Sequence, residues 1–306
     1  MTFIELCAGS AAVSLAWLRA GAVPPIGYQG SKRAFAEPIL NAFGLAPGGA
    51  GPDDRVILVE AGPWGEAWQH WRTPGGRVDT CSRLCAWAAE EPRVLWDRLR
   101  RAPVPVDCAE RVTVWVALQY WSFRSKPVTV EGGYWRTHGI HLDVDASAYA
   151  AGYVAPDGRT WVRRDRRLPD VVRALETLPD LSRVEVVRGD ARDAAPIPGA
   201  VVYLDPDYQG ATDYNSFSLP RADVLAVAER WRRAGCRVAV SEAEPLPLEW
   251  PCYVKLPPPR GRGRTWSKQR EEWLTVSECA HQKRLTIAEQ FGYSIGLNEK
   301  ETRPCP

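Results

Sequence analysis

Residues 2–10 read Thr-Phe-Ile-Glu-Leu-Cys-Ala-Gly-Ser, and the next ten residues, Ala11–Ala20, have a helical composition. The apolar run Thr2–Leu6 predicts a buried strand that ends in a turn of small residues. Arg55–Glu60 predicts a second strand, which is again followed by a helical segment, Trp64–Trp71. Strands that alternate with helices are typical of an α/β domain built on a parallel, doubly wound sheet.

The same alternation resumes in the second half of the chain. The predicted strands there are Val184–Val187, Ala200–Leu204, Arg237–Ser241 and Glu271–Ser277, and the predicted helices are Leu168–Leu178 and a segment from Ser218 to Ala234. A further helix is predicted over Tyr28–Phe43.

The middle of the chain has a different character. Arg93–Arg101 and Ala109–Phe123 have helical composition, and the residues up to 167 are polar and rich in glycine, aromatic residues and arginine. Hairpins are expected around Gly132-Gly133 and Asp157-Gly158. We therefore predict one domain formed by residues 1–92 and 168–279, an inserted target-recognition region at 93–167, and a loosely attached tail at 280–306.

Composition limits the function classes. The 306-residue chain carries 39 basic and 37 acidic residues, so any contact with nucleic acid must use local basic stretches. No apolar run approaches the length of a membrane span, and the N-terminus lacks a secretory pattern. Together with eight scattered cysteines, these features predict a cytoplasmic protein with reduced thiols, no membrane partner and no metal site.

Two strand ends carry residues that suit a binding site. Cys7-Ala8-Gly9-Ser10 would let a ligand approach the backbone closely, and Glu60 would bind ribose hydroxyls. Asp205-Pro206-Asp207-Tyr208 follows a third apolar strand, where a fixed acid accepts a hydrogen bond from an exocyclic amine and a tyrosine stacks on a base. Each motif taken separately is also explained as an ordinary turn.

Taken together and in order, these motifs resemble the Dam-type family of DNA adenine methyltransferases, which use S-adenosylmethionine. The family pattern Phe-x-Glu-x-Phe-Ala-Gly-Ser-Gly-Ala-Val is similar to Phe3–Val13, and the family element Lys-Trp-Ala-Gly-Gly-Lys is similar to Gly27–Arg33. Gly189-Asp190 resembles the family's Gly-Asp, and residues 205–208 resemble its catalytic Asp-Pro-Pro-Tyr. The resemblance covers most of residues 2–277 outside the inserted region and implies a Rossmann-like methyltransferase sheet.

The chain departs from the family pattern in two places. The element that contains Lys32 usually precedes the first strand, whereas here it follows the first helix. Asp207 stands where the family has proline, and it replaces a stiff residue with a flexible, acidic one.

The resemblance implies methyl transfer to adenine N6 of a base flipped out of the duplex. Asp205 and the Pro206 carbonyl would accept hydrogen bonds from the amine, and Tyr208 would stack on the base. The residues implied in cofactor binding are Tyr28, Gln29, Gly30, Lys32, Glu5, Cys7, Ala8, Gly9, Ser10, Glu60, Asp190, Ala191 and Asp205. Neither a metal nor a covalent intermediate is required.

Double-stranded DNA is the expected partner. Lys255–Arg270 has six basic residues and no acid, and Arg159–Arg173 has six arginines against two aspartates. Such stretches suit phosphate contacts, although a solvated charged loop is the commoner explanation. The residues expected to contact DNA are Arg124, Arg136, Arg163, Arg164, Arg260, Arg262, Arg264 and Lys268. The alternatives are a cytosine-N4 or RNA amino-methyltransferase and a catalytically inactive DNA-binding relative.

Overall fold

The computed structural model describes residues 1–27, 31–122, 126–137, 153–154, 160–161, 167–208, 219–250, 252–256, 272–278 and 295–297. The chain divides into two compact units. The first comprises Met1–Val23, Ser31–Gly65 and Pro179–Pro306, and the second comprises Pro24–Gly30 and Glu66–Leu178.

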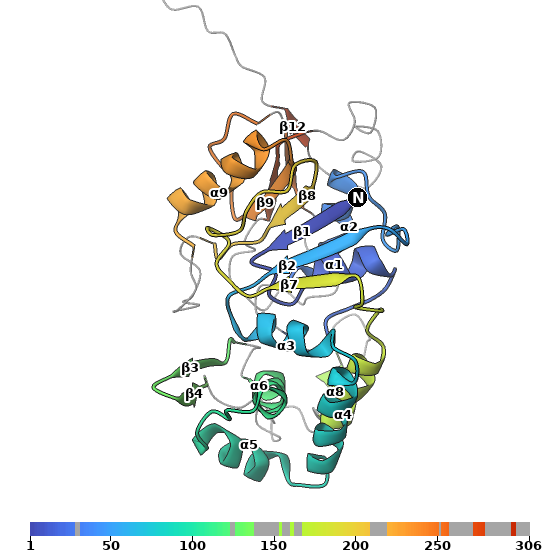
Figure 1. The fold of residues 1–306 in the computed structure, drawn as a ribbon, viewed down its shortest axis with the longest axis vertical. Helices are drawn as coiled ribbons and strands as arrows, with labels where there is room; N and C mark the ends of the chain where they lie inside the picture. Colours follow the sequence, from blue (N-terminus) through green and yellow to red (C-terminus); the bar gives the residue numbers. More distant parts are fainter. Residues whose placement is uncertain are drawn as a thin grey trace, which may run out of the picture. The chain divides into compact units, whose positions relative to one another are not determined.

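The first unit is a mixed α/β structure built on a mostly parallel sheet of eight strands (Figure 1). The strands are β1 (Thr2–Leu6), β2 (Arg55–Val59), β7 (Val184–Val187), β8 (Val201–Leu204), β9 (Arg237–Glu242), β10 (Cys252–Lys255), β11 (Trp273–Val276) and β12 (Ile295–Leu297). Their order across the sheet is β12-β10-β11-β9-β8-β1-β2-β7. Strands β9, β8, β1, β2 and β7 are parallel, whereas β11, β10 and β12 each pair antiparallel with their neighbours.

The parallel strands reverse their order in the middle of the sheet. The chain forms β1, then adds β2 and β7 on one side, and afterwards adds β8 and β9 on the other side of β1. The reversal therefore lies between β1 and β8. In open α/β sheets, ligands bind beyond the carboxyl ends of the strands at this kind of switch point.

Helices cover both faces of this sheet because successive side chains of a strand point to opposite sides. The helical elements of the unit are α1 (Ala12–Leu18), the short 3₁₀ helix η1 (Lys32–Ala34), α2 (Ala36–Ala42), the start of α3 (Pro63–Trp71) and α9 (Arg221–Arg233). On one face, Ile4 and Leu6 of β1 belong to an apolar cluster with Trp231 of α9. On the other face, the ring of Phe3 lies 5.3 Å from that of Trp17 in α1.

One prediction about this unit is wrong in detail. The helix expected over Tyr28–Phe43 consists of η1 and α2 within the described residues, because Pro38 lacks an N–H and fits only the first turn of a helix. Within residues 280–306 the structure describes only β12, which pairs with β10. An exposed strand edge offers unpaired N–H and C=O groups, and β12 satisfies those of β10.

The second unit is mainly helical. Its elements are the remainder of α3, α4 (Gly76–Trp87), α5 (Pro92–Arg101), α6 (Cys108–Trp121), α8 (Leu168–Glu176), and two strand pairs, β3 (Thr129–Glu131) with β4 (Tyr134–Arg136) and β5 (Tyr153–Val154) with β6 (Thr160–Trp161). The two antiparallel pairs lie at the positions of the predicted hairpins. Helix α4 packs against both α6 and α8, and α5 packs against α6.

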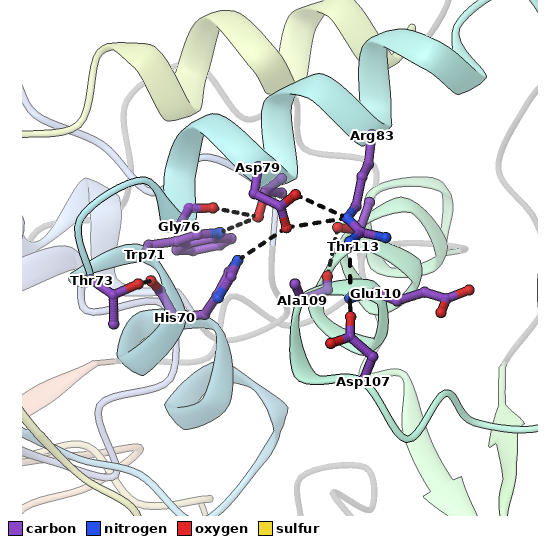
Figure 2. Close-up of polar contacts among 11 residues, drawn as sticks. His70, Trp71, Thr73, Gly76, Asp79, Arg83, Asp107, Ala109, Glu110 and Thr113 are labelled. Carbon is purple, nitrogen blue, oxygen red and sulfur yellow. Dashed lines mark hydrogen bonds and ion pairs between the residues drawn. The ribbon is translucent and has the colours of Figure 1, made fainter.

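Polar contacts connect α3, α4 and α6 (Figure 2). The indole Nε1 of Trp71 donates to the hydroxyl of Thr80 over 3.2 Å. Asp79 accepts hydrogen bonds from Arg83, whose guanidinium also lies 3.9 Å from Asp107 at the start of α6. Asp107 in turn caps α6 by accepting the Glu110 N–H over 2.8 Å, as expected of an aspartate at this position.

The compact units do not share the boundaries that the sequence suggested for the inserted region, 93–167. The second unit extends from Glu66 to Leu178 because α4 packs with both α6 and α8. Helix α4 was not predicted from the sequence, and α8 was assigned to the catalytic domain. None of the helices in the described part of the chain is long and apolar enough to cross a membrane.

Candidate active site

Four neighbouring strands of the first unit end at the same edge of the sheet. Leu6 of β1 is in register with Val59 of β2 and with Leu204 of β8. The next residues of the chain remain bound at this edge, since the Asp205 N–H donates to the Leu6 carbonyl over 3.2 Å and the Glu60 N–H donates to the Val187 carbonyl over 3.1 Å. The switch point of the sheet is therefore lined by the residues that follow β1, β2, β7 and β8.

The loop after β1 has an unusual backbone. Cys7, Gly9 and Ala11 all have positive φ angles, of 54°, 45° and 52°. The left-handed region costs a non-glycine residue about 1–2 kcal/mol. One acid bonds to this loop and a second bonds to the first turn of α1, which follows it. Glu60 accepts the Gly9 N–H over 2.7 Å, and Glu5 accepts the N–H of Ser14 over 2.8 Å.

Glu60 is fixed by close packing as well as by hydrogen bonds. Its second oxygen accepts the Gly62 N–H over 2.7 Å, and a Cβ added at Gly65 would lie 2.5 Å from the Glu60 carbonyl oxygen. Only glycine fits at that position. Each carboxylate oxygen accepts more than one hydrogen bond, so Glu60 keeps capacity for hydroxyl groups of a ligand.

We expect Gly65→Ala to lower the free energy of unfolding by about 1–3 kcal/mol, because the new methyl group would overlap backbone. Alanine normally stabilises a helical position relative to glycine. Gly189→Ala is the matched control, since nothing lies within 4 Å of a Cβ at Gly189, which is also bonded to Glu60. Urea unfolding of both variants measures the difference, and equal stabilities would contradict the close approach at Gly65.

Glu5 lies in the interior, with 2% of its surface exposed, and its Oε2 accepts both the N–H and the hydroxyl of Ser14. The sequence placed Glu5 among the cofactor-binding residues, and the structure places its carboxyl where it supports the start of α1. Burial raises the pKa of this carboxyl from 4.5 to about 8.

The raised pKa of Glu5 gives stability a pH dependence. The folded protein holds the Glu5 proton more tightly than the unfolded chain does, so this group stabilises the fold at low pH and loses that contribution as pH rises through about 8. We expect Glu5→Gln to reduce the fall in unfolding free energy between about pH 5 and about pH 8. Glu37→Gln, at an exposed position of α2, should keep the wild-type dependence; identical profiles for the two variants would refute the assignment.

Asp205 is oriented by two partners on one oxygen. Its Oδ1 lies 2.9 Å from Lys32 Nζ and accepts the Ser241 hydroxyl over 2.9 Å. Ser241 is itself bonded to the buried Tyr203 hydroxyl, also over 2.9 Å. Among the residues that the structure describes, Oδ2 of Asp205 has no hydrogen-bond or ion-pair partner. The carboxylate is thus fixed on one side and presents an acceptor on the other.

Lys32 lies among acidic and aromatic groups. Only 5% of it is exposed, and besides Asp205 it contacts Glu272, whose Oε1 is 3.4 Å from Nζ, and the Tyr208 ring, whose centroid is 4.5 Å away. The Tyr208 hydroxyl donates to the same Glu272 oxygen. Such an arrangement neutralises an ammonium that burial would otherwise disfavour.

Acidic groups dominate the electrostatics of this edge. Burial, reinforced by the charges of Asp205 and Glu60, raises the pKa of Asp207 to about 7. Burial also raises the pKa of Glu60, against the hydrogen bonds from Gly9 and Gly62. Burial raises the pKa of Glu272 to about 7, against the opposing effect of Lys32. An edge with this surplus of carboxylates suits a cationic ligand.

The structure brings most predicted site residues of the first unit to this edge. Cys7, Ala8, Gly9 and Ser10 form the loop after β1, and the Ser10 hydroxyl lies 2.8 Å from that of Ser31. The Asp190 carboxylate is bound by Arg192 over 2.7 Å, and Ala191 is part of the apolar cluster around α9. Tyr28, Gln29 and Gly30 lie outside the described residues.

The predicted DNA-contacting residues are described only in part. Arg136 lies on β4 of the second unit, where it is exposed and forms a 3.2 Å ion pair with Glu131. Seven others lie outside the described residues: Arg124, Arg163, Arg164, Arg260, Arg262, Arg264 and Lys268.

Two residues of the Lys32 and Asp205 network were not predicted from the sequence. Ser241 lies near the end of β9, which neighbours β8. A polar residue near the end of an apolar strand is the signal in the sequence that could have identified it. Glu272 immediately precedes β11, which runs antiparallel to β9. An antiparallel strand starts at the edge where its parallel neighbours end, so an acid before β11 reaches the site.

No protein-family model matches the chain, and a search of curated proteins finds no similar sequence.

Proposed function

We propose that the first unit binds S-adenosylmethionine and transfers its methyl group to the exocyclic amine of a nucleic-acid base, adenine N6 of a base flipped out of double-stranded DNA. The observation that carries this proposal is the difference between the two carboxylate oxygens of Asp205. One oxygen is held by Lys32 and Ser241, and the other has no bonding partner among the described residues. That arrangement is what an acceptor for an amine N–H requires.

The surroundings of Asp205 support the cofactor. The loop Cys7–Ala11 brings backbone close to the switch point of the sheet, and Glu60 follows the adjacent strand. The parallel strand order and its reversal between β1 and β8 are compatible with the doubly wound methyltransferase sheet that the sequence suggested. The cofactor supplies an electrophilic methyl group on a cationic sulfur, and a site rich in carboxylates favours a cation.

The chain's own groups would act by positioning. Asp205 Oδ2 and the Pro206 carbonyl oxygen would accept the two N–H groups of the target amine and so orient its lone pair. Tyr208 would stack on the base with the ring face that Lys32 does not cover. Holding two reactants in line accounts for a large part of the rate of a bimolecular transfer.

The test is an assay with tritiated S-adenosylmethionine and unmethylated duplex DNA, followed by digestion to nucleosides. We expect label in N6-methyldeoxyadenosine. The label should be lost or strongly reduced in Asp205→Ala. Asp193→Ala, at an exposed aspartate of the same unit, is its control and should retain the label.

Other outcomes of this assay redirect or overturn the proposal. Label in N4-methyldeoxycytidine, or in RNA offered in parallel, would change the target while preserving the role of Asp205. A folded protein that labels no nucleoside would overturn methyl transfer and favour the DNA-binding relative that has lost catalysis.

A further inference from the structure

Glu272 joins two functional groups through a single oxygen. Its side chain is 13% exposed, and Oε1 both accepts the Tyr208 hydroxyl and pairs with Lys32 Nζ at 3.4 Å. The Glu272 carbonyl also accepts the Leu256 N–H over 2.7 Å, which ties the residue to the strand pair β10 and β11. Glu272 therefore occupies a fixed position from which it reaches the site.

Lys32, Tyr208 and Glu272 form a closed ring of contacts, and Asp205 is joined to this ring through Lys32. Lys32 lies 2.9 Å from Asp205, 3.4 Å from Glu272 and 4.5 Å from the centre of the Tyr208 ring, and Tyr208 completes the ring by donating to Glu272. The four residues come from η1, the segment after β8 and the start of β11. None of these segments would fix the geometry alone.

Glu272 and Asp205 both attract the Lys32 ammonium. A buried ammonium with one carboxylate partner would move to contact both of its oxygens, because unlike charges attract strongly in a poorly solvated site. Glu272 also attracts this ammonium, and Lys32 contacts Asp205 at Oδ1, so that Oδ2 remains without a partner among the described residues. The hydrogen bond from Tyr208 fixes the tilt of the aromatic ring in the same way.

We propose that Glu272 is a positioning residue of this site, which orients Lys32 and Tyr208 so that Asp205 presents one free oxygen beside a correctly placed aromatic ring. The inference rests on the proposed methyl transfer for its effect on rate. The contacts of Glu272 do not depend on the proposed methyl transfer and are testable in the protein without substrate.

The positioning effect depends on the ionised form of Glu272. Its pKa is about 7, so the anion is lost as pH falls below neutrality. The titratable side chains on the elements packed around it are Lys32 of η1, Tyr203 of β8, Asp205, Asp207 and Tyr208 after β8, Glu242 of β9, and Tyr253 and Lys255 of β10. The Lys32 charge favours the anion, and the Asp205 charge opposes it.

The first measurement uses no substrate. In protein labelled with ¹³C at the glutamate carboxyl carbons, the resonance that disappears in Glu272→Gln belongs to Glu272. We expect its titration midpoint near pH 7 in the wild type. The midpoint should rise in Lys32→Met and in Tyr208→Phe, since each change removes a group that favours the anion. Midpoints that are unchanged in both variants would overturn the proposal.

The second measurement is the pH profile of methyl transfer. We expect Glu272→Gln to lower kcat about 10–100-fold through misplacement of reacting groups, with little change in the KM for the cofactor. It should also remove the Glu272 contribution to the acid limb near pH 7. The pKa of Asp207 is also about 7, so the contribution of Glu272 is read from the difference between the pH profiles of the wild type and of Glu272→Gln.

Glu278→Gln, an exposed glutamate just after β11, is the control that should match the wild type. An active wild type whose Glu272→Gln variant keeps both kcat and the acid limb would overturn positioning. A wild type that transfers no methyl group overturns the proposed function instead, and the carboxyl titration then decides whether the Glu272 contacts exist.

Discussion

Asp205→Ala is expected to lower kcat for methyl transfer about 10²–10³-fold, which is the typical cost of removing one preorganised polar group that acts in a transition state. The substitution removes the oxygen that would accept the amine. It leaves in place the loop after β1 and Glu60, which would hold the cofactor. The affinity for S-adenosylmethionine, measured by calorimetry, should therefore change much less than kcat.

Two controls separate chemistry from folding. Asp193→Ala removes an exposed aspartate from the same unit and should leave kcat unchanged. Urea unfolding of Asp205→Ala should show a folded protein, because Lys32 retains Glu272 as a partner. An Asp205→Ala protein that keeps wild-type kcat would remove Asp205 from the reaction, and one that loses cofactor affinity in proportion to kcat would assign it to binding.

Lys32→Met is expected to cost about 3 kcal/mol of unfolding free energy near neutral pH, because breaking a buried ion pair leaves its partners uncompensated. Here two carboxylates, Asp205 and Glu272, would lose the ammonium that pairs with both of them. Arg33→Met, at the exposed neighbouring position of η1, is the matched control and should be close to neutral.

The loss in Lys32→Met should depend on pH in a definite direction. Lys32 lowers the pKa of Glu272, so its removal raises that pKa further above the value in the unfolded chain. The folded variant then gains a proton as pH falls, which reduces the destabilisation at about pH 5 relative to about pH 8. A deficit that is equal at both pH values, by urea unfolding, would show that Lys32 acts through packing of its methylene groups and not through charge.

The residues that follow the parallel strands could be predicted from sequence because the rule behind them is local. An apolar run such as Thr2–Leu6 predicts a strand, and alternation with helices predicts parallel pairing. The carboxyl ends of parallel strands then share one edge, which already places Cys7, Glu60 and Asp205 together. Helix α4 could not be predicted in this way because its buried positions are few and mostly not apolar side chains: they are Gly76, Thr80 and Leu84.

What the sequence alone determined is therefore the α/β class, the parallel strands and the edge at which the acids gather, since these follow from the periodicity of single segments. Tertiary structure decided the rest. It placed the start of the antiparallel β11 at that edge, which brought Glu272 to Lys32 and Tyr208. It also packed α4 with α6 and α8, which set the limits of the second unit. The physical reason is that contacts between segments far apart in the chain depend on how whole elements pair and pack, and no local pattern encodes that choice.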